Sequence, residues 1–207
     1  MSPALKPALK IASAAAAYTA AAAVLLLNAP LVGRLLVPLF DGFIPLVYSR
    51  FDFHSVKLIK RKTEWYFFLQ VNNSQAIPFG KTQLIANAGP SSQTLLAHSV
   101  QHILFLGLVL LCGALYRRCN PWRLVGAGLL LLLLVELLDV PFVLSGAIED
   151  LLVAYLGNDG WASTLRIEWM GFLNNGGRIA LALVCGWIAL IFAAVDDTRR
   201  PPAPARQ

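Results

Sequence analysis

The hydrophobic positions of the chain fall into long runs separated by shorter polar segments. The clearest run covers residues 124–144, LVGAGLLLLLLVELLDVPFVL. It is long enough to cross a bilayer, because a transmembrane helix needs about 20 predominantly apolar residues. Comparable runs cover residues 11–30, 95–116 and 178–195. We predict a transmembrane helix over each of the four runs.

The segment between the first two runs, residues 31–94, has a different pattern. Its first part, residues 31–48, is apolar but interrupted by glycine, proline and charged residues, so we expect it to follow the membrane surface. β-Branched and aromatic residues then alternate with polar ones, which predicts a β-hairpin over residues 56–71. A further short strand is predicted near residues 82–86, and Gly-Pro-Ser-Ser at 89–92 predicts the start of the next helix.

The second long polar segment, residues 145–177, predicts three local structures. Apolar residues at helical spacing over 148–156 indicate an amphipathic helix on the membrane surface, with Glu149 and Asp150 on its polar side. Alternation over residues 164–169 indicates a strand that adds to the hairpin. Asn-Asn-Gly-Gly at 174–177 is expected to be a breaker before the last span, which Arg178 opens. Pro141, just before this segment, is expected to loosen its own helix at the outer end.

These elements define the predicted fold class, a mainly α-helical membrane protein with a small extracytoplasmic β element and an interfacial amphipathic helix. Only 14% of the residues are charged and 57% are hydrophobic, whereas a soluble domain is about one quarter charged. The predicted order is a cytoplasmic N-terminus (1–10), helix 1 (11–30), an outer loop with the hairpin (31–94), helix 2 (95–116), a cytoplasmic turn (117–123), helix 3 (124–144), an outer loop with the amphipathic helix and strand (145–177), helix 4 (178–195) and a disordered cytoplasmic tail (196–207).

The distribution of basic residues predicts the orientation. Four spans place both termini on one side, whose short flanks hold eight Lys and Arg residues, whereas residues 145–178 hold two. The positive-inside rule therefore places both termini in the cytoplasm. The first outer loop opposes this count with seven basic residues, but the rule weakens for long loops. We expect residues 11–30 to be an uncleaved anchor, with a cleaved signal peptide as the alternative.

Charged and polar residues inside the predicted spans are the main candidates for a site. Glu136 and Asp139 share one helix face at i and i+3, about 12 and 8 Å below the outer end of their span. His98 and His102 share a face at i and i+4, about 5 and 10 Å below the same end. Arg178 begins the last span. We predict that these five residues occupy one layer of the outer leaflet.

Three interpretations of this layer are open. It is a structural network in which the carboxylates pair with arginine or histidine, or a contact surface for a larger membrane partner. Alternatively it is a chemical site that relays protons, or in which His98, His102 and Asp139 bind a metal or haem, since two histidines four residues apart have a plausible ligand spacing. The HExxH motif is absent from the sequence.

A second candidate region is the basic segment of the predicted hairpin. Lys57, Lys60, Arg61 and Lys62 lie among aromatic residues. They are expected to form a solvated strand edge near lipid head groups, or to bind an acidic segment of a partner protein. Nucleic acid is excluded as a partner because the basic residues of the chain lie mostly beside apolar spans.

The layout resembles the exosortase H-associated membrane protein family. The resemblance rests on the chain length, the first span, the aromatic and basic segment from Phe51 to Asn73, the sequence ELLDVP at 136–141 and the acidic second outer loop. It implies a multi-pass protein of the bacterial inner membrane that assists a multi-span, exosortase-like enzyme in processing C-terminal sorting signals. On this basis we expect a non-enzymatic accessory protein without a cofactor.

The sequence argues against the chain being an exosortase itself. Those enzymes resemble intramembrane cysteine proteases and have more spans than this chain can hold. Cys112 lies about 6 Å from the inner end of its predicted span, far from His98 and His102, whereas a catalytic Cys–His pair must come within hydrogen-bond reach. The three cysteines are therefore expected to be thiols without a catalytic role. The alternative function is a small metal-, haem- or quinone-binding membrane subunit that uses the histidines and carboxylates.

Overall fold

The computed structural model describes residues 5–48, 52–73, 76–79, 82–86, 89–116, 119–156 and 164–194. The fold is mainly helical, with a three-stranded antiparallel sheet and a separate two-stranded one. Within the described residues, five helical segments are long and apolar enough to cross a membrane. The elements are α1 (Leu5–Leu27), α2 (Ala29–Val47), β1 (Asp52–Arg61), β2 (Glu64–Asn72), β3 (Ile77–Phe79), β4 (Thr82–Leu84), β5 (Ser91–Leu95), α3 (Leu96–Tyr116), α4 (Pro121–Leu156), α5 (Leu165–Phe172), the π-helical turn η1 (Leu173–Gly177) and α6 (Arg178–Ala193).

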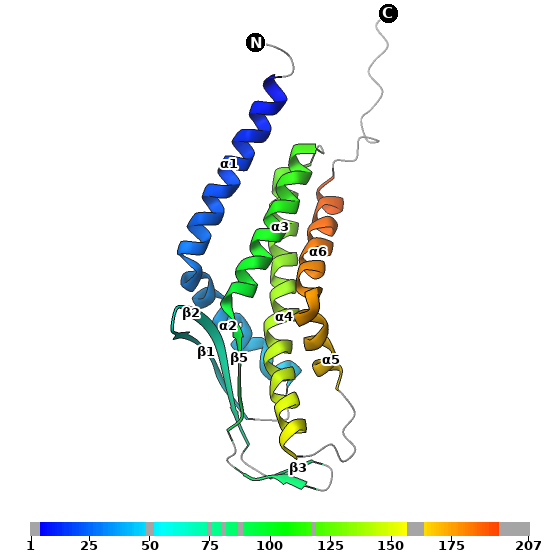
Figure 1. Cartoon of the computed structure of the whole chain (residues 1–207). Helices are drawn as coiled ribbons and strands as arrows, with labels where there is room; N and C mark the ends of the chain where they lie inside the picture. Colours follow the sequence, from blue (N-terminus) through cyan, green and yellow to red (C-terminus); the bar gives the residue numbers. More distant parts are fainter. Residues whose placement is uncertain are drawn as a thin grey trace, which may run out of the picture.

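The molecule has two parts stacked along its length (Figure 1). Helices α1, α3, α6 and the first part of α4 form one end, where α1 begins and α6 ends, and the sheets with α2 and the end of α4 form the other. Glycines allow the helices of the first end to approach closely, because a Cβ on Gly113 would lie 2.0 Å from Leu190 Cδ2. Small residues serve the same purpose in many membrane helix pairs. Helix α1 leans away from this group, although the Tyr18 hydroxyl donates to the Leu104 carbonyl at 2.7 Å.

Helix α2 is continuous, although the sequence predicts an interrupted apolar segment here. Pro38 and Pro45 both lie inside it. Phe40 and Ile44 are completely buried in the main hydrophobic core, and the Asp41 carboxylate accepts a hydrogen bond from the Val56 amide at 2.6 Å. Burial of this face against β1 compensates for the hydrogen bonds that proline removes from a helix.

The predicted hairpin is confirmed, and the sheet order is β1-β2-β5. Val56 pairs with Leu69, and Leu69 pairs in turn with Ser92 of β5. The predicted helix start at residues 89–92 is wrong, because residues 91–95 extend the sheet before α3 begins at Leu96. The predicted strand near residues 82–86 exists as β4, but it pairs with β3 in a separate hairpin.

Helix α4 continues through Pro141, where the sequence predicts a loosened outer end, and includes the segment predicted as a separate surface helix. It has 36 residues and is therefore about 54 Å long. Near the proline, Trp169 Nε1 donates to the Leu138 carbonyl at 2.8 Å and Ser145 Oγ to the Pro141 carbonyl at 2.8 Å. The apolar face of its last part packs beneath the sheet through Ile148, rather than on lipid as predicted.

The predicted strand over residues 164–169 is wrong, and these residues open helix α5. Thr164 caps this helix, and its Oγ1 accepts from the Ile167 amide at 3.4 Å. The capping residue outweighs a period-two pattern that is only a few residues long. The predicted helix breaker at 174–177 is present as a kink in η1, where Gly176 has a φ of 101°, a value that favours glycine.

Candidate functional site

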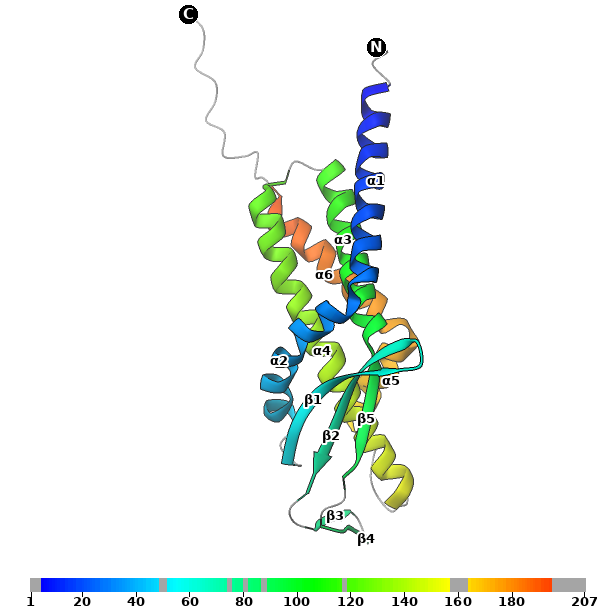
Figure 2. The ribbon, with the colours of Figure 1, turned by 90° about the vertical axis from the view of Figure 1, so that its left-hand side faces the viewer.

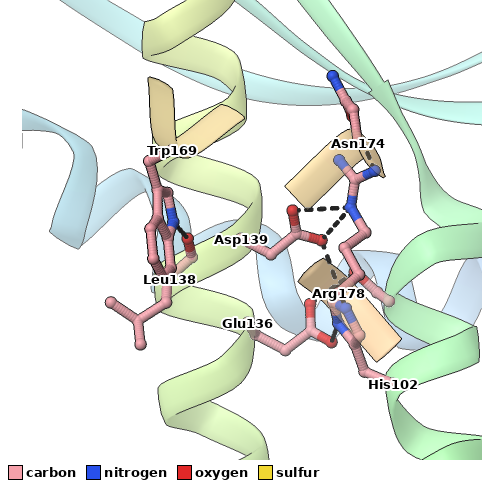
Figure 3. Close-up of polar contacts among 8 residues, drawn as sticks. His102, Glu136, Leu138, Asp139, Trp169, Asn174 and Arg178 are labelled. Atoms are coloured by element: carbon pink, nitrogen blue, oxygen red, sulfur yellow. Dashed lines mark hydrogen bonds and ion pairs between the residues drawn. The ribbon is translucent and has the colours of Figure 1, made fainter. Parts of the chain in front are cut away.

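The carboxylates of α4 face α3 and α6 inside the apolar part of the molecule. Glu136 is 0% exposed and Asp139 is 1% exposed. Their i, i+3 spacing places both on the same side of the helix, as Figure 3 shows. Carboxylates buried this deeply need partners, because an unpaired charge in an apolar environment is very unfavourable.

Glu136 is held from helix α3 by two side chains. Ser99 Oγ donates to Glu136 Oε2 at 2.6 Å. His102 Nδ1 lies 3.1 Å from Glu136 Oε1. Ser99 and His102 are themselves fully buried, so this contact joins α3 to α4 away from water.

His102 also reaches the second carboxylate with its other ring nitrogen. Its Nε2 lies 3.6 Å from Asp139 Oδ2, so the imidazole stands between the two acids (Figure 3). A doubly protonated imidazole can donate toward both sides, whereas a neutral one has a single N–H. At 3.6 Å the contact with Asp139 is longer than a hydrogen bond, and Nε2 has no hydrogen-bond partner among the described residues.

Arg178 completes the cluster from the first turn of α6. Its Nε donates to both oxygens of Asp139, at 2.9 and 3.0 Å, and Nη1 donates to Asn174 Oδ1 at 2.9 Å. Asn174 lies in η1 directly before the kink at Asn175 and Gly176, so the breaker sequence also supplies a hydrogen-bond acceptor for the arginine. Arg178 Nη2 is buried and has no hydrogen-bond partner within the described part of the chain.

The charges of this cluster can balance. With His102 protonated, two cations face two carboxylates, and the group is neutral. Neutrality matters here because taking an ion out of water costs several kcal/mol. Close pairing with an opposite charge offsets about that cost, whereas an unpaired ion has nothing to offset it. The cluster, which we call the upper cluster, consists of Ser99, His102, Glu136, Asp139, Asn174 and Arg178 and ties α3, α4 and α6 together.

Four of the five residues predicted to share a layer are thus brought together. His98 lies one turn before His102 on α3 and is partly exposed, and the described hydrogen bonds and ion pairs of the upper cluster do not include it. Among the described residues, no group of three or more His, Cys, Asp and Glu side chains is arranged to hold a metal ion. The alternative ligand set His98, His102 and Asp139 is therefore not assembled in this structure.

Ser99 is the member that the sequence interpretation missed, and Asn174 is predicted only as part of the helix breaker next to Arg178. Ser99 precedes His102 by three residues and so shares its helix face, a spacing that was available in the sequence. Asn174 precedes Arg178 by four residues, so its hydrogen bond to the guanidinium also joins positions of helical spacing.

A second polar cluster, also missed, lies near the C-terminal end of α4. Glu149, predicted on an exposed polar side, is 2% exposed. Arg166 Nη1 donates to Glu149 Oε1 at 2.6 Å, and Nη2 donates to the Val47 carbonyl at 2.6 Å. The Thr164 hydroxyl also donates to Glu149, and the Arg166 guanidinium lies 5.0 Å from the Tyr48 ring centroid. This lower cluster joins α4 to α5 and to the end of α2.

The basic residues of the hairpin are solvent-exposed on β1 and its turn. Lys57, Lys60, Arg61 and Lys62 are all exposed. Lys60 Nζ lies 5.9 Å from the Trp65 ring centroid, and the Arg61 guanidinium carbon lies 5.9 Å from that of Phe68.

The acidic residue of the same turn has a partner of its own. Tyr66 donates its hydroxyl to Glu64 Oε2 at 2.6 Å, and this hydrogen bond raises the pKa of Tyr66 above its ordinary value. Glu64 therefore has one carboxylate oxygen engaged by a neutral phenol.

The three cysteines are free thiols, as predicted. Cys185 is buried, and Cys112 is exposed on the surface of α3.

Comparisons of the chain with family models, curated proteins and solved structures give no match. The class of the protein is therefore defined by its own fold, a mainly helical chain with a small antiparallel sheet. Its several long apolar helices are compatible with a multi-pass membrane protein.

Proposed function

We propose that four helical segments cross the membrane, namely α1, α3, the first two thirds of α4, and α6. A hydrocarbon core about 30 Å thick accommodates about 20 helical residues, so the 36 residues of α4 must project beyond it. The projecting end packs beneath the sheet through Ile148 and Leu152. Helix α2 is apolar enough to be a fifth span, but its buried face packs on the sheet, which supports a position outside the bilayer.

The proposed orientation places both termini in the cytoplasm of a bacterium and the sheet outside the inner membrane. The start of α1 and the end of α6 both lie at the end of the molecule opposite the sheet (Figure 1), which fits an even number of crossings. The exposed Trp122 lies at the start of α4 on the terminal side, a position typical of a membrane–water interface.

Within this topology the protein is a non-enzymatic accessory that assists a multi-span, exosortase-type partner. The observation that supports this proposal best is the mutual pairing of the buried charged side chains in the upper cluster, which suits a rigid scaffold. The outward faces of α4 and α6 remain apolar and exposed, as at Leu130 and Phe192, and are available to lipid or to the helices of a partner. The resemblance in layout described above suggests the kind of partner.

Purification of the tagged full-length protein from its native membrane in mild detergent tests this proposal. Mass spectrometry is expected to identify a multi-span sorting enzyme in a fixed ratio to the protein. The matched control is a second multi-pass protein of the same membrane that carries the same tag. Recovery of the protein alone, or of the same proteins that accompany the control, would contradict the accessory role.

A second function is favoured by one observation, the position of the His102 ring between Glu136 and Asp139, at 3.1 and 3.6 Å. Ionisable groups within membrane helices often mark proton pathways or ligand sites. This candidate is a small subunit that transfers protons or binds a metal, haem or quinone. Purified protein in vesicles with a trapped pH indicator would then carry a proton flux that His102→Gln abolishes. Metal analysis and the visible absorbance spectrum of the same sample test for a bound cofactor.

A further inference from the structure

The turn between β1 and β2 lies close to the level at which the apolar helices end. In both Figure 1 and Figure 2 the turn is at the height of the junction between α1 and α2, and the opposite ends of the strands lie farther from the helical bundle. The candidate span in α1 ends at Leu27, so this height marks one boundary of the apolar layer. In the topology proposed above, the hairpin therefore points back toward the membrane.

The turn is also strongly basic. Lys60, Arg61 and Lys62 are consecutive and exposed, and the nearest acidic residue in the sequence, Glu64, accepts a hydrogen bond from Tyr66. Lys62 has a φ of 54°, which turns the chain sharply between the strands. Three adjacent cations at one end of a hairpin produce a local positive potential that attracts anionic surfaces.

Aromatic side chains accompany these cations. Trp65 lies beside Lys60, and Phe68 lies beside Arg61. Tyr66 follows Trp65 in the sequence of β2. Tryptophan and tyrosine are enriched at the head-group level of membranes because they combine an apolar ring with a polar group. Basic residues next to such rings are the pattern of a surface that rests among lipid head groups.

We propose that this hairpin tip, defined as residues 60–66, binds the head groups of anionic phospholipids. The phosphate of the lipid is the group recognised, and the tip docks the sheet against the leaflet from which α1 emerges. This inference concerns the lipid contact only, and it holds whether or not the protein assists a sorting enzyme. An acidic segment of a partner protein is the competing occupant.

A fluorescence experiment on the full-length protein in lipid nanodiscs tests the proposal. Thr63→Cys, in a chain whose three native cysteines are changed to alanine, carries a fluorophore at the exposed turn. A second labelled variant, Ala76→Cys, reports from an exposed position beyond the other end of the hairpin. The discs contain phosphatidylcholine alone or mixed with phosphatidylglycerol, together with a nitroxide-labelled lipid that quenches at shallow depth.

The label at residue 63 is expected to be quenched about twofold more in the anionic discs, and raised salt should remove the difference. The label at residue 76 should show no dependence on lipid charge. When K60Q, R61Q and K62Q are combined in the chain labelled at residue 63, the extra quenching of that label in anionic discs should disappear.

A matched pair of single changes locates the effect. Arg61→Gln and Lys57→Gln each remove one exposed positive charge from the same strand, but Lys57 lies about 13 Å farther from the turn. Arg61→Gln should lower the quenching clearly more than Lys57→Gln, because charges beyond about 10 Å are screened. Equal quenching of residue 63 in neutral and anionic discs overturns the proposal and favours the acidic protein segment. Equal effects of the two single changes also overturn it.

Discussion

Helix α4 carries two arginine–carboxylate pairs that differ in their surroundings. In the upper cluster, the Arg178 side chain is 9% exposed and pairs with Asp139 among apolar helices. In the lower cluster, the Arg166 side chain is 32% exposed and pairs with Glu149 near the sheet. The upper pair shares its carboxylate with a histidine, whereas the lower pair is completed by a hydroxyl and a backbone carbonyl.

The difference shows how the environment determines what an ion pair contributes. Water can reach Arg166 and replace part of an interaction that is lost, whereas the side chains of Arg178 and Asp139 are only 9% and 1% exposed. Breaking a fully buried pair by removing one partner typically costs about 3–5 kcal/mol, whereas pairs that solvent can reach contribute much less. The two clusters should therefore respond differently to the same substitution.

The largest effect is expected for Arg178→Met, which leaves Asp139 buried without its cation. The free energy of unfolding should fall by about 3–5 kcal/mol. The change is measured by unfolding the purified protein in mixed micelles with increasing SDS and following helix content by circular dichroism.

The double change Asp139→Leu with Arg178→Met is the control for this prediction. It removes both charges, and it should recover at least half of the lost stability, because replacing a whole buried pair by apolar residues is often close to neutral. A double variant as unstable as the single one would mean that the pair is needed for its shape rather than for charge balance.

The next largest loss of stability is expected for Gly146→Ala, which disturbs the contact between α4 and α5 next to the lower cluster. A Cβ on Gly146 would lie 2.7 Å from the Arg166 carbonyl oxygen and 3.1 Å from Met170 Cβ, so Gly146→Ala must push α5 away from α4. Overpacking of this kind costs about 1–3 kcal/mol. The matched control is Gly171→Ala on α5, whose added Cβ meets nothing within 4 Å. Equal stabilities of the two variants, measured by the same SDS unfolding, would contradict the close α4–α5 contact.

Arg166→Met tests the lower pair directly and should be milder than Arg178→Met. It removes the hydrogen bonds to Glu149 and Val47, but solvent can enter in place of a side chain that is 32% exposed. The expected loss is about 1–2 kcal/mol. Added salt should reduce the difference between wild type and this variant, and it should leave the Arg178→Met difference almost unchanged. Similar losses for the two arginines would remove the distinction between the clusters.

Local patterns in the sequence predict much of this architecture. The apolar runs give the long helices, and the alternation over residues 56–71 gives the hairpin. The i, i+3 spacing of Glu136 and Asp139 predicts their common face, which the fold directs at His102 and Arg178. These features depend on residues that are close together in the sequence, so the pattern of residue types reveals them directly.

The features that the sequence does not predict depend on contacts between distant segments. Helix α4 continues past Pro141, and Trp169 from α5 donates to the Leu138 carbonyl less than one turn before the proline. Residues 91–95 form a strand because β2 offers an edge to pair with. Glu149 is buried because Arg166, 17 residues later, returns to it. Tertiary contacts override local propensity at each of these places.

The smallest effect is expected for Trp169→Phe, which tests the support that α5 gives to α4 at the level of the upper cluster (Figure 3). The phenyl ring keeps most of the packing against Phe172, whose ring centroid lies 5.2 Å away, but it cannot donate to the Leu138 carbonyl. Loss of one such hydrogen bond costs about 0.5–1.5 kcal/mol. If this bond helps to keep α4 continuous past Pro141, amide hydrogen exchange should accelerate at residues 142–145 in the variant, while residues near Glu136 remain protected by the upper cluster. Acceleration that spreads evenly along α4, or no acceleration at all, would mean that the helix passes the proline without help from Trp169.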